Sequence, residues 1–221
     1  MAPPVLSGII VEYIDVRRTL TTLVDSLIRH PNNPASLYLA VDHRSLVIYM
    51  APALTINIVD LGEFSSALHQ GHESALALKS VLEATTTTKV FFDARTPARI
   101  LYDRCGIKLA IQIFTQQSNI HEVQMMELAL RRNDSHRQWL ATFDKCIAKD
   151  SNLSLDGLLL GVGYGDVALD DRILHLPILW KRYHDLLTAH ENNNGQSFWI
   201  AQIREATQKR LEVSCGKEHV G

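Results

Sequence analysis

The sequence has no excess of positive charge. Over 221 residues, 22 lysines and arginines stand against 24 aspartates and glutamates, which gives a net charge of −2. Proteins that bind nucleic acids tightly usually carry a basic excess, because neutralising phosphates supplies much of their affinity. The charge balance therefore restricts any contact with nucleic acid to a local patch or a weak interaction, or excludes it.

Cysteines and long apolar runs are also scarce. The three cysteines (Cys105, Cys146 and Cys215) are widely spaced and odd in number, which favours reduced thiols over a disulfide framework. No apolar run approaches the roughly 20 residues that span a bilayer. The Met-Ala-Pro-Pro start lacks the basic and apolar regions of a secretory signal. We therefore expect a cytoplasmic or nuclear chain without a membrane-spanning segment.

The apolar residues that are present form strand-length runs between helical patterns. Residues 37–41 and 89–92 are almost wholly apolar, which is typical of strands covered on both faces. Apolar residues at helical spacing precede, separate and follow them. This alternation predicts one mixed α/β domain, with a sheet centred on residues 37–41 and residues 89–92 beside it.

Further elements follow from the same patterns. Strands are expected at residues 8–14, 47–50 and 54–59, and helices around residues 20–28, 76–82, 97–105, 123–130, 139–147 and 173–187, with a last one from Trp199. Thr96 and Pro97 are expected as N-cap and first helical residue, and Pro177 as a kink. Residues 65–74 are expected to be a polar connection.

Three local motifs carry alternatives. The glycines of residues 161–165 resemble a phosphate loop, but the Lys-Ser/Thr of a Walker A motif is missing, so a turn is the better interpretation. His69, His72 and Glu73 could be metal ligands, yet a solvated loop explains them equally. The residues Arg131, Arg132, His136 and Arg137 are either a solvated helix end or a patch that contacts phosphates.

Four blocks occur in a particular order: Ser-Leu-Tyr-Leu-Ala-Val-Asp at 36–42, Lys-Val-Phe-Phe-Asp-Ala-Arg at 89–95, Asn-Ile-His-Glu-Val-Gln-Met-Met-Glu-Leu at 119–128, and His-Leu-Pro at 175–177. With their spacing, they resemble the fungal branch of the ribonuclease D-like 3′–5′ exonucleases, also called the DEDD or DnaQ-like family. The resemblance implies a ribonuclease H-like fold, a mixed sheet with helices on both faces, over residues 8–190. A C-terminal helix and polar tail would occupy residues 191–221.

The chemistry that the resemblance implies needs four carboxylates. These hold two Mg²⁺ or Mn²⁺ ions, one of which activates water while the other stabilises the leaving 3′ oxygen. Such hard cations need oxygen ligands, and few other side chains replace a carboxylate. Each acidic position of the family pattern was therefore compared with this sequence.

Most of these positions are substituted. Asp42 stands at the first ligand position, but Arg44 occupies the second, where a positive charge repels a dication. Pro97 occupies the third. Arg44 is either an exposed cation at a strand end or a guanidinium that pairs with Asp42 and Glu122 in place of a metal.

The last two motifs have also changed. Glu122 stands where the family has an aspartate, and it is either an altered metal ligand or a solvent-facing carboxylate at a helix start. Ala168 and Arg172 occupy the positions of the general-base tyrosine and the last aspartate. Asp171 is one residue out of register, which turns a helical side chain by about 100°.

Three hypotheses remain open. The first is a 3′–5′ exonuclease-like domain that binds RNA, single-stranded DNA or a protein partner without cleavage, with Asp42 and Glu122 as remnants of the site. The second is a surviving exonuclease that uses Mg²⁺ or Mn²⁺ held by Asp42 and Glu122 with unconventional ligands. The third is a dead paralogue or mispredicted gene fragment with no selected function.

Overall fold

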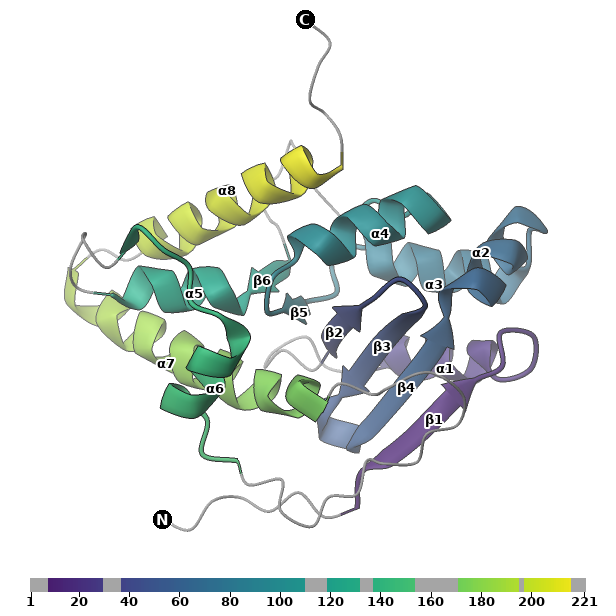
Figure 1. Ribbon diagram of the computed structural model, residues 1–221, viewed down its shortest axis with the longest axis horizontal. Coiled ribbons are helices and arrows are strands. Elements are labelled where there is room, and N and C mark those ends of the chain that lie inside the picture. Colours follow the sequence, from purple (N-terminus) through teal and green to yellow (C-terminus); the bar gives the residue numbers. More distant parts are fainter. Residues whose placement is uncertain are drawn as a thin grey trace, which may run out of the picture.

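A mixed sheet lies at the centre of the protein (Figure 1). The computed structural model describes residues 8–29, 37–109, 119–131, 137–153, 171–194 and 197–215. Within these residues the sheet has six strands in the order β1-β4-β3-β2-β5-β6. The strands are β1 (Ile10–Ile14), β2 (Leu37–Val41), β3 (Ser45–Met50), β4 (Thr55–Asp60), β5 (Lys89–Phe91) and β6 (Ile120–Glu122).

The register of the strands fixes where the candidate residues lie. Strands β2, β3 and β4 form an antiparallel meander, whereas β5 joins β2 in parallel and β6 joins β5 in parallel. Leu37, Lys89 and Ile120 share one row across these three strands. The carboxyl ends of β2, β5 and β6 therefore meet at the same edge of the sheet. The predicted sheet, with residues 37–41 next to residues 89–91, is confirmed.

Helices cover both faces of this sheet, as the apolar runs predicted. One face packs against α1 (Leu20–Arg29), α2 (Leu61–His69), α3 (Glu73–Glu83) and α4 (Arg95–Cys105), and Leu211 of α8 (Ser197–Ser214) joins that core. The other face packs against α5 (Val123–Leu130), α6 (Phe143–Asp150), the short 3-10 helix η3 (Asp171–His175) and α7 (Leu176–Asn194). Side chains along β2 alternate between the two cores, with Leu39 in the first and Tyr38 in the second.

Residues 65–74 are not the polar connection that we expected. Helix α2 runs to His69, and α3 begins at Glu73. Asp60 caps α2, since its Oδ1 accepts the backbone N–H of Glu63 at 2.8 Å. Leu61, Phe64 and Ala67 are buried at helical spacing, so three apolar positions were enough to bury one face of this short helix.

Three helix boundaries also differ from expectation. Helix α4 begins at Arg95, which makes Pro97 its third residue; a proline is tolerated there because first-turn N–H groups have no intrahelical partner. Pro177 is the second residue of α7, where it starts the helix instead of kinking it. Helix α6 begins at Phe143, because Thr142 caps it through the N–H of Lys145. Trp139 therefore lies outside the helix, and it is 79% exposed.

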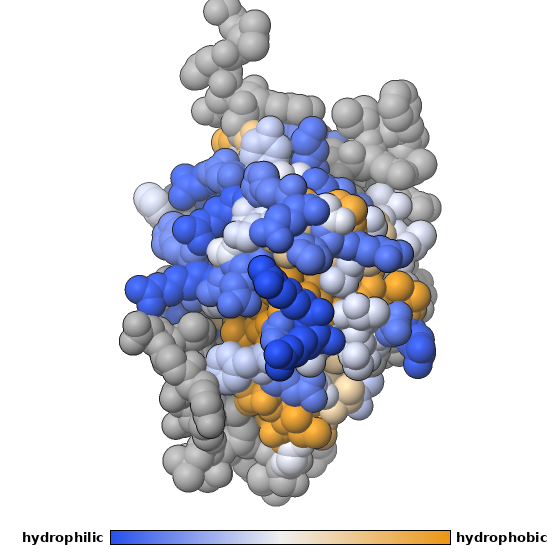
Figure 2. Space-filling view, turned by 90° about the vertical axis from the view of Figure 1, so that its right-hand side faces the viewer, coloured by the Kyte–Doolittle hydropathy of each residue, from blue (hydrophilic) through white to orange (hydrophobic). Residues whose placement is uncertain are grey.

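The surface of the domain is polar where the first helices lie. Figure 2 shows the right-hand side of Figure 1, where α2 lies; this face is mostly hydrophilic, and its hydrophobic residues form smaller groups between polar ones. Among the described helices, none is both long enough and apolar enough to cross a membrane.

Candidate functional site

Asp42 closes the tight turn between β2 and β3. Its Oδ1 accepts hydrogen bonds from the backbone N–H groups of Arg44 and Ser45, both at 2.7 Å, and from the Ser45 hydroxyl at 3.1 Å. The backbone N–H of Asp42 in turn donates to the Ser45 carbonyl. One carboxylate oxygen thus satisfies the turn, which explains an aspartate at this position without any metal.

Glu122 ends β6 and immediately precedes α5, as expected for a residue at a helix start. Its side chain does not face solvent, however, because its exposed fraction is 0%. Burial raises the pKa of Glu122 to about 7, although the charge of Arg210 opposes this shift. A buried carboxylate on the sheet edge therefore replaces the solvent-facing one that we had considered.

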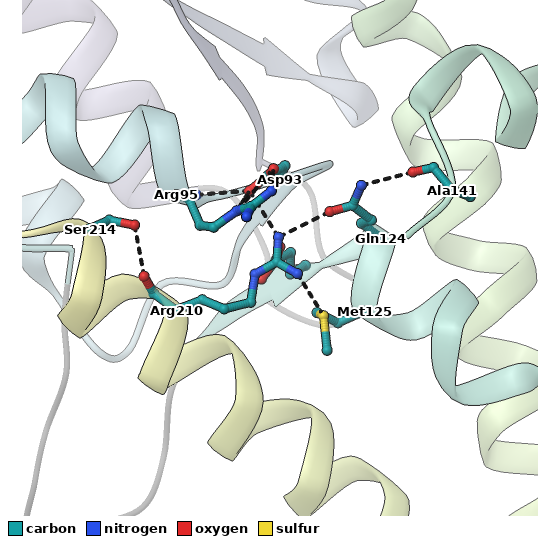
Figure 3. Close-up of polar contacts among 8 residues, drawn as sticks. Asp93, Arg95, Gln124, Met125, Ala141, Arg210 and Ser214 are labelled. Carbon is teal, nitrogen blue, oxygen red and sulfur yellow. Dashed lines mark hydrogen bonds and ion pairs between the residues drawn. The ribbon is translucent and has the colours of Figure 1, made fainter. Parts of the chain in front are cut away.

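The guanidinium of Arg210, on α8, lies among the side chains of Asp93, Gln124 and Met125 (Figure 3). It also forms an ion pair with Glu122. Its Nη2 atom is 2.8 Å from Glu122 Oε1, 3.2 Å from Asp93 Oδ1 and 3.0 Å from Gln124 Oε1. Its Nη1 atom donates to the sulfur of Met125 at 3.0 Å. We call the three oxygens around Nη2 the oxygen triad. A guanidinium therefore pairs with Glu122, as one alternative from the sequence had it, but it is that of Arg210 and not that of Arg44.

Neighbouring residues hold two members of the oxygen triad in place. Asp93 forms a bidentate pair with Arg95, with Nη2 and Oδ2 2.6 Å apart. Burial alone raises the pKa of Asp93, but the hydrogen bonds and charge of Arg95, with the charge of Arg210, lower it overall. Gln124 donates its side-chain amide to the Ala141 carbonyl at 2.8 Å, which directs its Oε1 towards Arg210.

The strand register separates the backbones of Asp42 and Glu122. Glu122 lies two residues beyond the row that contains Leu37, Lys89 and Ile120, whereas Asp42 lies five residues beyond it. With about 3.3 Å per residue and about 4.8 Å between strands, their Cα atoms are about 14 Å apart. That separation is too large for both side chains to reach a single metal ion.

The three substituted positions have separate environments. Arg44 is exposed in the β2–β3 turn, and its backbone carbonyl accepts the N–H of Leu61 at 2.8 Å. Pro97 is buried in the first turn of α4. Arg172 lies over the ring of Phe143 at 5.8 Å and pairs with Asp144 at 3.4 Å.

The other motifs from the sequence do not form a site in the described residues. The Nδ1 of His69 contacts the Ser65 carbonyl at 2.7 Å, and no group of three or more His, Cys, Asp or Glu residues there could hold a metal. Arg131 pairs with Glu127 at 2.6 Å, and Arg137 donates to the Arg131 carbonyl, so both have structural roles. The positions Arg132, His136, Ala168 and residues 161–165 lie outside the described residues.

Sequence reasoning missed most of this arrangement. Asp93 lies in the block at residues 89–95, and Gln124 and Met125 lie in the block at residues 119–128, but no role was expected for any of the three. Nothing in the sequence indicated where Arg210 would lie. The buried residues Thr207 and Leu211 set the phase of α8 and so turn Arg210 towards the sheet, but the docking place of α8 is a tertiary property.

Comparisons with known proteins give the fold. No family model matches this sequence, and no curated protein matches it significantly. RNase D of Trypanosoma brucei, solved in complex with RNA U12, has a TM-score of 0.52 and 14% identity over 96% of this chain and 72% of that chain. The catalytic core of RRP6 from the same organism has a TM-score of 0.60 and 12% identity, over 96% and 55% of the two chains.

A bacterial structure matches over nearly its whole length. NrnC of Brucella melitensis, solved with bound Mg²⁺, has a TM-score of 0.50 and 12% identity over 100% of this chain and 98% of that chain. At these identities the likeness concerns the fold alone. The protein has the α/β ribonuclease H-like fold of 3′–5′ exonuclease domains, as the sequence resemblance implied.

Proposed function

We propose that this domain binds single-stranded nucleic acid, RNA or DNA, without cleaving it. The fold is that of exonuclease domains, and one of the matched RNase D structures is a complex with RNA. Binding without cleavage is supported by a single arrangement: the guanidinium of Arg210 stands at the carboxylates of Asp93 and Glu122. A positive charge of the protein itself therefore partly neutralises these two carboxylates, which makes them poorer ligands for a metal ion.

The donor set does not fit a two-metal centre. Four carboxylates would be needed to hold two divalent ions, but the described edge offers Asp93 and Glu122, both paired with Arg210, while Asp42 closes a turn. Degenerate DEDD motifs would explain this arrangement, with Asp42 and Glu122 as remnants and Arg44, Pro97 and Arg172 as replacements. Mg²⁺ or Mn²⁺ would be the cofactor only of an active enzyme.

We also propose a family branch, a cellular location and an alternative partner. Membership of the fungal branch rests on the sequence blocks alone. A cytoplasmic or nuclear location rests on the three cysteines, all of which are free in the structure. A protein partner is the alternative to nucleic acid, in which case the domain would be an interaction module that retains an exonuclease fold.

The test measures binding and cleavage on the same sample. The purified chain is mixed with fluorescently labelled single-stranded RNA or DNA, and anisotropy is followed at increasing salt, with and without Mn²⁺. We expect weak binding that falls steeply with salt, because phosphate contacts release counterions. The same mixtures, separated on a denaturing gel, should show no shortening from the 3′ end.

Two outcomes would reject the proposal. Mn²⁺-dependent shortening that Asp42→Ala abolishes would establish an active exonuclease. Absence of both binding and cleavage would leave the protein-interaction alternative. A net charge of −2 makes the salt dependence the sharper part of the binding test, because only a local basic surface can produce it.

A further inference from the structure

Three oxygen atoms surround one nitrogen of Arg210. Asp93 Oδ1, Gln124 Oε1 and Glu122 Oε1 lie between 2.8 and 3.2 Å from Nη2, and they come from the loop after β5, from α5 and from the end of β6. Two of these oxygens belong to carboxylates and one belongs to a side-chain amide. Carboxylate and amide oxygens are the ligands that hard divalent cations select in proteins.

The guanidinium satisfies this triad incompletely. Nη2 directs its two N–H bonds at Asp93 and Gln124, so Glu122 has Arg210 as a charge partner at 2.8 Å but accepts no aligned hydrogen bond from it. The neighbouring Thr207 hydroxyl lowers the pKa of Glu122 only in part. The exposed fraction of Glu122 is 0%, so its carboxylate is shielded from bulk solvent. The Nε of Arg210 is also buried without a hydrogen-bond partner. Buried polar groups in proteins normally have a hydrogen-bond or ligand partner, so a buried carboxylate with incomplete hydrogen bonding is a candidate ligand for a bound ion.

We propose that Asp93, Glu122 and Gln124 form a binding site for a single divalent cation, and that Arg210 occupies this site as a built-in competitor. A spherical ion bonds to all three oxygens at once, which the planar guanidinium does not. Helix α8 carries Arg210, so docking of α8 closes the site and withdrawal of its guanidinium opens it. The site differs from the ligand positions that the sequence resemblance implies, because neither Asp93 nor Gln124 stands at one of them.

The inference does not depend on nucleic-acid binding. The oxygen triad is set by β6, α5 and the loop after β5, and the test uses the metal alone. Failure of nucleic-acid binding would leave the cation site standing, and failure of the cation site would leave the binding proposal untouched. The two proposals are therefore separable by experiment.

The first experiment removes the competitor. The full chain carrying Arg210→Met is titrated with Mn²⁺ while the free ion is followed by electron paramagnetic resonance. We expect an affinity at least about tenfold above that of the wild type, since a like charge within a few ångströms has been removed. Lys209→Met, an exposed change on the same helix, should leave the wild-type titration unchanged.

A second substitution locates the ion. Adding Glu122→Gln to Arg210→Met removes one charged ligand and should lower the Mn²⁺ affinity by about 10- to 100-fold, the usual cost of disturbing a metal site. Equal titrations for Arg210→Met and the wild type would overturn the proposal. So would a double variant that binds Mn²⁺ as well as Arg210→Met does.

A measurement on the wild type covers the case in which Arg210→Met does not fold. Millimolar Mn²⁺ should displace Arg210 and speed hydrogen exchange of the α8 amides, while exchange in α1 stays constant. The effect should disappear in Glu122→Gln. An α8 exchange rate that does not respond to Mn²⁺ would then reject the site.

Discussion

Arg210 and Glu122 form an ion pair in which the acid is fully buried and the base is nearly so. Their atoms Nη2 and Oε1 are 2.8 Å apart, and the side chains are 16% and 0% exposed. The pair joins α8 to the end of β6, across 87 intervening residues. The ion pair therefore connects α8 to the sheet. It also places a positive charge of the protein beside the carboxylates of Glu122 and Asp93.

The raised pKa of Glu122 predicts how stability changes with pH. Its pKa is about 7 in the folded chain, above its ordinary value of 4.5, so the folded state keeps this proton longer than the unfolded state. The contribution of Glu122 to stability is therefore largest below pH 4.5 and is lost as the pH rises to about 7. Over that window the cost should reach about 3 kcal/mol.

The measurement compares urea unfolding of the wild type with that of Glu122→Gln from pH 4.5 to 8. The difference between the two should shift in favour of Glu122→Gln as the pH rises. The unfolding free energies of the two proteins are subtracted at each pH because His121 also titrates. Burial lowers the pKa of His121 to about 4, so His121 reduces stability as the pH falls, the opposite of Glu122. Glu205→Gln, an exposed change on α8, is the control; a difference independent of pH would contradict the account.

A second prediction concerns Asp42 as a turn residue. Asp42→Ala removes the acceptor of three hydrogen bonds in the β2–β3 turn and should cost about 1–2 kcal/mol of unfolding free energy. Asp42→Asn keeps an oxygen at the same position and should cost less. Urea titrations with and without Mn²⁺ check this. Stabilisation of the wild type by Mn²⁺ that Asp42→Asn abolishes would make Asp42 a metal ligand instead.

Tyr183 supports a third prediction, on the opposite face of the sheet. Its hydroxyl donates to Asp150 Oδ2 at 2.8 Å, and burial raises the pKa of the hydroxyl. Tyr183→Phe keeps the ring but leaves the buried Asp150 short of one donor, which should cost about 1–3 kcal/mol. Thermal unfolding measures this, with Tyr102→Phe at an exposed site of α4 as the control. Equal losses in both variants would show that the bond contributes nothing specific.

Restoring one acidic residue should not restore an enzyme. In Arg44→Glu, the turn places the new carboxylate beside Asp42, but Pro97 and Arg172 still leave a second metal without ligands. The expected result is labelled RNA that stays intact in the presence of Mn²⁺. Cleavage by Arg44→Glu would mean that a single substitution accounts for the loss of activity.

The fold followed from the sequence more readily than the site. Runs such as Leu37–Val41 are buried on both faces, so local composition alone identified the central strand. Helix α2 was not predicted because its buried face consists of only three residues, Leu61, Phe64 and Ala67, after the capping residue Asp60. Local pattern determines elements well when one of their faces is continuous and apolar.

The site depends on contacts between distant residues. Glu122 was identified from a motif, but its burial and its partner follow from where α8 docks. Arg44 was one candidate for an arginine that pairs with Glu122. The strand register instead places Arg44 in the turn after β2, and β5 lies between β2 and β6. The pairing register of β2, β5 and β6 and the packing position of α8 depend on the whole fold. The spacing of residues along the chain therefore does not determine which side chains meet at the site.

The most direct test of this account is anomalous diffraction from crystals of the wild-type protein grown with Mn²⁺. The account predicts no manganese peak within coordination distance of Asp42, and either the guanidinium of Arg210 or a single manganese ion between the oxygens of Asp93, Glu122 and Gln124. Two manganese peaks at this edge, with Arg210 turned away, would contradict it and make the protein a metal-dependent exonuclease candidate.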